Sequence, residues 1–345
     1  SLNGSGIGTF SPFARDAIRG GGPMDGGDAL IANQGFVNGL WYDPNPLGGS
    51  RGKNDLMWQG DLIKAGLAGS IRSFTLLTHW GETKRLEELN GAGYVVDPGE
   101  AVNYIENHDN QTLFDNNAFK LPAGTSREDR ARVQILAAAL NTFSQGVAYF
   151  HAGVDTLRSK SLDRNSYDAG DWFNRIDWTY SDNLFATGLP LQGENGNNWG
   201  QMRPLLQDSS IKPTSNEIAW TRDAFRDLLR IRASTTLLRL RTADDIKARL
   251  RFHNVGPGQE PTVLMAAIDG SGYAGANFAE LVYLVNVDKA SKQISVDALK
   301  AKGFQLHPVH RAPGAADQRV ATQAAYDTAS GRFSIPARSA VVFVR

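Results

Sequence analysis

The stretch Ala101-Val102-Asn103-Tyr104-Ile105-Glu106-Asn107-His108-Asp109-Asn110 decides the fold. Its first half, residues 101–105, has the composition of a buried strand. A polar segment containing His108, Asp109 and Asn110 follows directly where that strand is expected to end. The segment therefore predicts a strand whose carboxyl end carries side chains capable of chemistry.

The residues that follow continue this pattern. Ser126 opens a capping-box pattern, and apolar residues at helical spacing predict a helix that ends at Gly146. A second strand is expected at 147–150, then a long polar loop to about Arg203, and a second helix from Asn216. Strand, helix, strand, helix is the order of a parallel α/β unit, and long loops after the strands are typical of the active face of a β/α barrel.

From about Leu240 the pattern changes to short apolar runs separated by turns such as Gly256-Pro257-Gly258. This arrangement predicts a small antiparallel β-sandwich. We expect strands at 248–253, 263–268, 281–287, 293–296, 303–308, 332–335 and 340–344. The fold class is thus α/β plus all-β, with residues 1–239 in a β/α-barrel portion and residues 240–345 in a β-sandwich domain.

Composition narrows the function classes. The chain has 345 residues, a formal net charge of zero and no cysteine. A neutral balance gives no reason to expect nucleic acid or an anionic membrane as partner, and thiol chemistry is excluded. No apolar run is long enough to cross a bilayer. Residues 1–60 are rich in Gly, Asn, Asp and Pro and are expected to be mainly loop, although Ser11–Arg19 favours a short helix.

Two segments could carry chemistry. An imidazole and a carboxylate at a strand end, as in His108-Asp109, could grip sugar hydroxyls or stabilise positive charge. Spacing alone favours the plainer interpretation, in which Asp109 caps the next element. Residues 157–177 mix aromatic side chains with Asn, Asp and Arg, which suits a sugar site and an ordered surface loop about equally. We expect Trp41, Trp58 and Trp80 to be core residues rather than sugar platforms.

Several motifs, in order, resemble the pullulanases of the α-amylase superfamily of glycoside hydrolases. Tyr104–Asp115 resembles their late conserved motif, and residues 150–161 with 165–177 resemble their loop after the last barrel strand. Residues 6–10 and 15–23 resemble the stretch that follows their general-acid motif. The resemblance covers essentially the whole chain and implies that residues 1–239 are the C-terminal part of a (β/α)8 barrel.

The resemblance also implies an activity. Pullulanases cleave α-1,6 branch linkages of pullulan, amylopectin or limit dextrins with retention, which requires two carboxyl groups about 5–5.5 Å apart. A third carboxylate, matched here by Asp109, stabilises the transition state. His108 and Asn110 match residues that hold the sugar, and Asn165 and Tyr167 match the loop that lines the substrate.

The chain departs from the family pattern in one respect. No segment resembles the nucleophile motif or the general-acid motif, and both would lie before Ser1. We therefore expect this polypeptide to be inactive alone, and to be stable only with the N-terminal half of the enzyme or by self-association, because half a barrel leaves an open sheet edge.

Other functions stay open from the sequence. An isoamylase-like or limit-dextrinase-like debranching enzyme is the nearest alternative, and a non-catalytic glucan-binding fragment is one from another class. No cofactor is predicted, although Asp25–Asp28 could offer oxygen ligands to calcium. The sequence shows no export signal, and the resemblance implies an extracellular or periplasmic enzyme.

Overall fold

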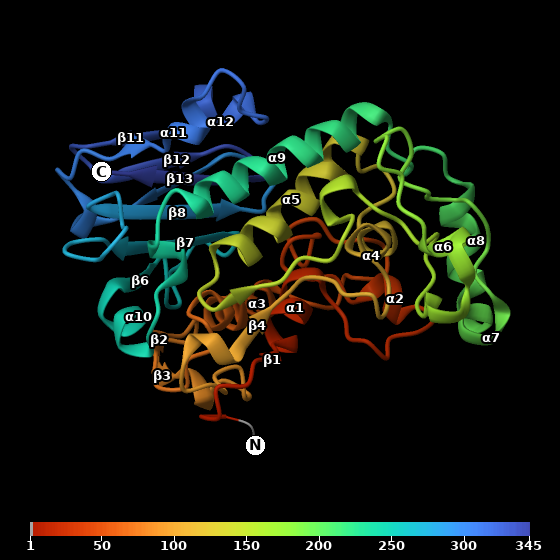
Figure 1. Cartoon of the computed structure of the whole chain (residues 1–345), viewed down its shortest axis with the longest axis horizontal. Helices are drawn as coiled ribbons and strands as arrows, with labels where there is room; N and C mark the ends of the chain where they lie inside the picture. The colour runs from red at the N-terminus through yellow and green to blue at the C-terminus, as the bar shows by residue number, and fades with distance from the viewer. Residues whose placement is uncertain (1–2) are drawn as a thin grey trace.

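The computed structural model describes residues 3–345 (Figure 1). A short parallel sheet has the order β1 (Thr9–Phe10), β4 (Ala101–Asn103) and β5 (Val147–Ala148). Phe10 pairs with Val102, and Val102 pairs with Val147. Both strands expected in the first part of the chain, at 101 and at 147, are confirmed. They are shorter than predicted, and His108, Asp109 and Asn110 lie in the loop after β4.

Long helices accompany these strands. The predicted helices are α1 (Pro12–Arg19), α5 (Arg127–Phe143) and α9 (Ser215–Ala233), and Ser126 caps α5 by accepting from the Asp129 backbone N–H. Residues 3–60 are mainly loop, as expected, but the unpredicted helix α3 (Lys53–Leu67) begins near the end of this stretch. Its buried residues include Gly60 and Gly66, where small size permits close packing of neighbouring side chains, and this composition obscured the helix.

The remaining elements are short and mostly surround the long loops. The helices are α2 (Ala29–Ala32), α4 (Leu113–Lys120), α6 (Gly170–Asn174), α7 (Gln192–Asn195), α8 (Trp199–Gln207), α10 (Ala243–Arg249), α11 (Pro308–Arg311) and α12 (Gln318–Gln323). A hairpin of β2 (Thr75–Leu77) and β3 (Thr83–Arg85) follows α3.

The C-terminal part contains two antiparallel sheets. One has the order β10-β13-β8-β7-β6 and the other has the order β11-β12-β9. The strands are β6 (Leu250–His253), β7 (Val263–Asp269), β8 (Glu280–Asn286), β9 (Lys292–Ser295), β10 (Gln305–Leu306), β11 (Ala325–Asp327), β12 (Arg332–Ile335) and β13 (Ser339–Val344). Strand β11 was not predicted. The run 303–308 is strand only over β10, because Pro308 begins α11.

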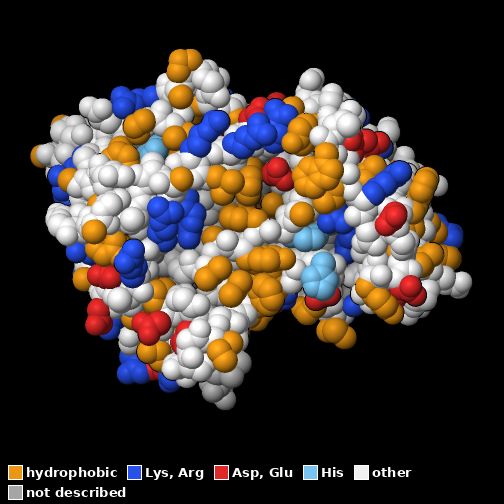
Figure 2. Space-filling model, viewed as in Figure 1, with side chains coloured by type: hydrophobic (Ala, Val, Ile, Leu, Met, Phe, Trp, Pro, Cys, Tyr) orange, Lys and Arg blue, Asp and Glu red, His pale blue; other side chains and the backbone are white. Residues whose placement is uncertain are grey.

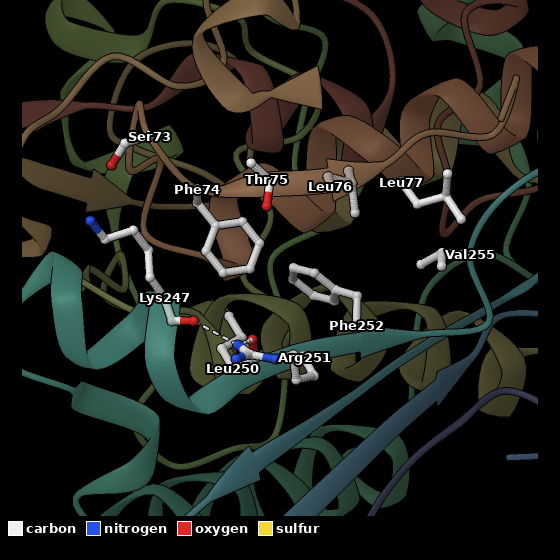
Figure 3. Close-up of a pocket in the computed structure, with 10 residues that line it drawn as sticks. All are labelled: Ser73, Phe74, Thr75, Leu76, Leu77, Lys247, Leu250, Arg251, Phe252 and Val255. Atoms are coloured by element: carbon white, nitrogen blue, oxygen red, sulfur yellow. Dashed lines mark hydrogen bonds between the residues drawn. The ribbon is translucent and has the colours of Figure 1, made fainter. Parts of the chain in front are cut away.

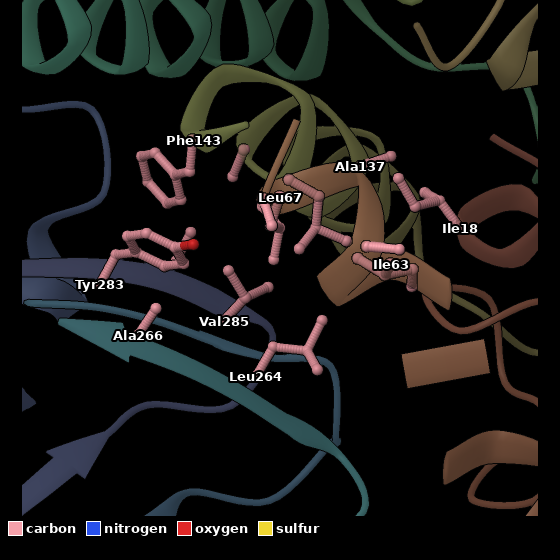
Figure 4. Packing of buried hydrophobic residues seen from close by; sticks show 14 of the residues in the cluster. Ile18, Ile63, Leu67, Ala137, Phe143, Leu264, Ala266, Tyr283 and Val285 are labelled. Carbon is pink, nitrogen blue, oxygen red and sulfur yellow. The ribbon is translucent and has the colours of Figure 1, made fainter. Parts of the chain in front are cut away.

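The core is continuous across the predicted boundary at residue 240. Alternate residues of β7 and β8 face opposite sides, so that Leu264, Tyr283 and Val285 pack against α3 and α5 (Figure 4). The Tyr283 ring stacks on Phe143 of α5 at 5.1 Å between centroids. The other faces of these strands join a second cluster with residues of the three-stranded antiparallel sheet. Strands β7 and β8 are therefore covered on both faces.

The parallel sheet differs from this arrangement. Within residues 3–345, β1 and β5 each have a partner strand on one side only. Ile7, Phe10 and Val147, in or beside these strands, are 52%, 46% and 45% exposed. Figure 2 shows hydrophobic side chains gathered across the middle of the face where Figure 1 draws β1, β4 and α5. The parallel sheet therefore presents apolar surface and unpaired backbone to solvent.

Two further observations bear on the sequence expectations. Trp41 and Trp80 are 40% and 42% exposed, and Trp58 is half-buried, so the expectation that all three are core residues was wrong. No helix among residues 3–345 is long and apolar enough to span a membrane.

Candidate functional site

The loop after β4 presents His108 and Asp109 to solvent. Their side chains are 74% and 69% exposed, and His108 Nδ1 lies 3.4 Å from an Asp109 carboxylate oxygen. The next residue, Asn110, has a left-handed backbone with φ of 61°, a conformation that Asn tolerates better than most residues. This turn leaves a carboxylate and an imidazole side by side at the carboxyl end of a parallel strand, where they can hold hydroxyl groups and stabilise positive charge.

A buried network under this loop begins at Glu106, whose side chain is 1% exposed. One carboxylate oxygen of Glu106 lies 2.9 Å from His151 Nδ1, and the other accepts the Leu113 backbone N–H. Arg158 Nη1 lies 3.3 Å from His151 Nε2, and the same guanidinium donates to the Asn174 carbonyl. This chain of contacts connects the loop after β4 to the loop after β5 and to α6.

A second network connects the same two loops. Asp115, at the start of α4, accepts hydrogen bonds from the Ser159 hydroxyl and, at 2.8 Å, from the Lys160 backbone N–H. Lys160 Nζ then donates to the His108 carbonyl at 3.0 Å. Burial raises the pKa of Asp115 to about 6 and lowers the pKa of Lys160. The backbone beside Asp109 is thus fixed by a buried hydrogen-bond network that includes two charged side chains.

The glycine-rich N-terminal loop closes the site from another side. The Pro23 carbonyl accepts from Asn110 Nδ2 at 3.4 Å and from Arg164 Nη2 at 3.0 Å. The neighbouring Asn165 is half-buried, and its backbone N–H donates to the Asp163 carboxylate at 2.9 Å. The structure therefore brings Asn110 and the Asn165 segment together around one carbonyl.

Large aromatic side chains stand on the loop after β5. Tyr167, Trp172 and Trp178 are 79%, 54% and 60% exposed. Trp172 donates its indole N–H to the Thr187 carbonyl, and the Arg175 guanidinium lies 4.7 Å from the centre of its ring. Exposed rings held in this way are suited to cover the apolar face of a sugar. Tyr167 stands on the same loop as Asn165 and points to solvent.

Sequence reasoning placed Asp109, His108, Asn110, Asn165 and Tyr167 at the site, and all five lie in the loops just described. It missed the buried partners that hold those loops, namely Glu106, Asp115, His151, Arg158 and Lys160. The signal that could have found them is the presence of charged residues directly beside predicted apolar elements, where burial requires a partner.

The acidic N-terminal loop is engaged in ordinary hydrogen bonds. Asp25 accepts from Asn33 Nδ2 at 2.9 Å, and Asp28 accepts from Gln201 Nε2 at 3.3 Å. No group of three or more His, Asp or Glu side chains among residues 3–345 is arranged to hold a metal ion.

One hollow away from these loops lies between β2 and β6 (Figure 3). It has a volume of about 420 Å³ and is lined by Phe74, Leu77 and Phe252, with Ser73, Lys247 and Arg251 at its margins. The two phenylalanine rings meet edge to face at 5.9 Å. The side chains of the candidate site do not line this groove.

Comparison with known proteins identifies the family. Residues 180–345 match a family model described as "Alpha-1,6-glucosidases, pullulanase-type, C-terminal". Over its whole length the chain is 39% identical to pullulanase 1, chloroplastic, of Arabidopsis thaliana, and 99% of it is 34% identical to the pullulanase of Klebsiella aerogenes. It covers 36% and 31% of these relatives.

The structural comparison agrees with the sequence comparison. The crystal structure of apo pullulanase from Klebsiella pneumoniae superposes with a TM-score of 0.91 at 33% identity, over 99% of this chain and 37% of that one. The chain thus spans about a third of the length of the curated relatives it matches. Residues 180–345 belong to the C-terminal domain family of pullulanase-type α-1,6-glucosidases, and the whole chain is similar in sequence and structure to the corresponding part of pullulanases.

Proposed function

We propose that this chain contributes one side of the active site of an enzyme that hydrolyses α-1,6 branch linkages of pullulan, amylopectin or limit dextrins with retention. The observation that carries the proposal is the exposed His108–Asp109 pair at the end of β4. Two buried networks hold this pair in register with an aromatic, polar loop. A neutral glucan fits the mixture of planar polar groups and exposed rings.

Each candidate residue has a role in this proposal. Asp109 stabilises the positive charge that develops on the sugar ring in the transition state. His108 and Asn110 hold hydroxyl groups of the sugar at the bond to be cleaved. Asn165 and Tyr167 line the neighbouring part of the substrate, where the Tyr167 ring can cover an apolar sugar face.

The nucleophile and the general acid come, in this proposal, from outside this chain. Retaining hydrolysis requires two carboxyl groups about 5–5.5 Å apart, one on each side of the scissile bond. The carboxylates nearest to the motif are not free for that task. Glu106 is buried against His151 and Leu113, and Asp115 is buried against Ser159 and Lys160. We therefore expect the chain alone to leave pullulan intact.

The three parallel strands are proposed to form the last part of a (β/α)8 barrel, followed by a β-sandwich from residue 240. The exposed Phe10 and Val147 at the outer strands favour this arrangement, because a closed barrel would cover them. The covering partner is the remainder of a polypeptide of pullulanase length or a second copy of this chain.

A hybrid enzyme tests the proposal. This chain replaces the corresponding segment of the Klebsiella pneumoniae pullulanase, and release of reducing sugar from pullulan is measured. We expect the hybrid to hydrolyse pullulan and Asp109→Ala to reduce kcat by at least about 100-fold. Asp244→Ala removes an exposed carboxylate of α10 and serves as control. Equal activity of the hybrid with and without Asp109 would refute the assigned role.

Two other functions remain as alternatives. An isoamylase-like or limit-dextrinase-like preference would appear as faster hydrolysis of glycogen or limit dextrins than of pullulan by the same hybrid. A purely glucan-binding role is favoured by the exposed Tyr167, Trp172 and Trp178. It would appear as retardation of the chain in amylopectin gels together with an inactive hybrid.

A further inference from the structure

A second group of aromatic side chains, one exposed and two partly buried, lies away from Asp109 around the turn between β2 and β3. His79 and Trp80 occupy this turn, and Trp58 comes from α3. The His79 ring lies 4.9 Å from the Trp80 ring and 6.3 Å from the Trp58 ring, and the two indoles are 6.0 Å apart. Figure 1 draws this hairpin and helix α6 of the aromatic loop at opposite ends of the molecule. We call Trp58, His79 and Trp80 the aromatic corner.

A buried ion pair fixes the aromatic corner from below. The His79 backbone N–H and ring Nδ1 both lie against one oxygen of Asp61, at 2.9 and 2.8 Å. Lys64 Nζ contacts the other oxygen at 3.1 Å and donates to Gln259 Oε1 at 3.0 Å. The side chains of Asp61 and Lys64 are completely buried.

Such burial is costly. Removing two charges from water carries a penalty that their mutual attraction offsets only when the geometry is good and further hydrogen bonds are made. Here the network holds a turn on the surface of the protein in one orientation. A preorganised surface is what ligand binding favours, because no side-chain ordering is left to be done when the ligand arrives.

The groups that the aromatic corner offers are those that recognise a sugar. Trp80 is 42% exposed, so part of its indole is open to a ligand. Within residues 3–345, neither the Trp58 indole N–H nor His79 Nε2 has a hydrogen-bond partner. With Nδ1 donating to Asp61, Nε2 is an acceptor in the neutral imidazole. One exposed ring beside one donor and one acceptor matches the apolar face and the hydroxyl groups of a pyranose.

The charges around the aromatic corner are paired, which favours a neutral ligand. Glu82 and Lys84 on the same hairpin form an ion pair at 3.2 Å, and the Glu82 carboxylate also accepts from the Trp80 indole. Asp61 and Lys64 neutralise each other below. An anionic or cationic ligand would find no unpaired opposite charge among these groups.

We propose that Trp58, His79 and Trp80 form a second glucan-binding site, which holds a glucose residue of a linear α-glucan chain at a distance from Asp109. The identity of the sugar rests on the proposed function, whereas the existence of the site rests on the geometry of the aromatic corner. Trp80 covers the ring, Trp58 donates to a hydroxyl group, and His79 accepts from another.

The test uses the whole chain and maltoheptaose as the probe. The indole N–H resonances of Trp58 and Trp80 are assigned in ¹⁵N-labelled protein by comparison with single variants and are followed during titration. We expect both resonances to shift. In Trp80→Ala, the affinity for maltoheptaose measured from the Trp58 resonance should fall by about fivefold or more. Trp80→Phe retains a ring and should keep most of the affinity.

The double variant Tyr167→Ala/Trp172→Ala is the matched control, because it removes two exposed rings from the aromatic loop and leaves the aromatic corner intact. The titration of Trp58 and Trp80 should be unchanged in it. If the indole resonances do not shift, or if they respond equally with and without the Trp80 ring, the second site is refuted. Protection of Trp80 from solvent in the hybrid enzyme without any response to maltoheptaose would assign the corner to a protein interface and would also refute it.

This outcome is separable from that of the proposed function. Loss of the Trp58 response in Trp80→Ala can coexist with an inactive hybrid, which would retain the second site and reject the catalytic role of Asp109. An active hybrid that depends on Asp109, together with Trp58 and Trp80 resonances that do not shift, would support the catalytic role and reject the second site.

Discussion

The parallel sheet and the five-stranded antiparallel sheet solve the problem of burial in opposite ways. In the antiparallel sheet, β7 and β8 are paired on both edges and covered on both faces, by α3 and α5 on one side and by the smaller sheet on the other. In the parallel sheet, β1 and β5 are short and paired on one edge only, and Phe10 and Val147 are half exposed.

The well-buried antiparallel sheet and the parallel sheet that carries the candidate site therefore differ in how much they contribute to stability. The antiparallel sheet shares its core with α3 and α5, so these elements bury one another's apolar surface. The parallel region carries Asp109 and its supporting networks, yet leaves unpaired strand edges, which are sites for pairing with further chain. The candidate site therefore stands on the sheet whose outer strands are unpaired within residues 3–345, and in the function proposed above additional polypeptide completes that sheet.

The largest expected effect compares one phenylalanine from each sheet. Phe343 of β13 is 1% exposed, whereas Phe10 of β1 is 46% exposed. We expect Phe343→Ala to lower the free energy of unfolding by about 3–5 kcal/mol, and Phe10→Ala to lower it by less than about 1 kcal/mol. Denaturant unfolding of the two variants measures both values. Similar losses would mean that the parallel sheet is buried in solution.

A smaller effect is expected from the network beneath the candidate site. Lys160→Met removes the donor to the His108 carbonyl and leaves Asp115 without its cation. We expect the free energy of unfolding to fall by about 1–3 kcal/mol. Amide hydrogen exchange should become faster in residues 106–113 and change little in β7 and β8. Hydrogen-exchange mass spectrometry resolves the two regions. Uniform acceleration along the chain would contradict a local role.

The antiparallel side has its own pH dependence. His310 of α11 accepts the Val342 backbone N–H, and burial lowers the pKa of His310 to about 3. Between pH about 6.5 and that value, the unfolded chain binds a proton that the folded chain does not. The contribution of His310 to the free energy of unfolding is therefore fully present above pH about 6.5, and it is lost as the pH falls toward the folded-state pKa.

The measurement for His310 is unfolding at several pH values. We expect wild-type protein to lose about 2 kcal/mol from this group between pH about 6.5 and about 5. The variant His310→Gln should have a flatter profile over the same range, because glutamine offers an acceptor without titrating. Parallel profiles for the two proteins would show that His310 does not govern the acid limb.

The smallest effect on stability is expected at the open edge. Val147→Lys adds a charge to β5, whose side chain at this position is 45% exposed. We expect the free energy of unfolding to change by less than about 0.5 kcal/mol. Self-association through this strand edge should weaken severalfold. Sedimentation velocity at increasing protein concentration measures the self-association, and denaturant unfolding measures the stability. Leu191→Lys, at another exposed apolar position, is the control.

Much of this architecture could be predicted from the sequence, for physical reasons that differ between regions. Helix α5 has a capping residue, Ser126, and a regular apolar stripe, so local signals agree with the tertiary fold. Strands β7 and β8 are continuous apolar runs between turns. Helix α3 and strand β11 were missed because long-range packing determines them more than local composition does.

The candidate site was predictable only in part. The motif residues His108, Asp109 and Asn110 could be named because they resemble a family pattern, and their exposure agrees with a substrate-facing role. The partners Glu106, His151 and Lys160 are distant in sequence from one another and meet only in the fold. Trp58 and Trp80 of the aromatic corner were expected to be core, because nothing in a sequence distinguishes a tryptophan at the surface from a buried one.

The most direct test of the central claim is the size of the chain in solution, measured by native mass spectrometry and sedimentation across a range of concentrations. If the parallel sheet must be completed, the isolated chain should associate with itself, and added N-terminal portion of a pullulanase should convert it to a discrete complex. A well-folded species that stays strictly monomeric and does not bind the N-terminal portion would contradict the account.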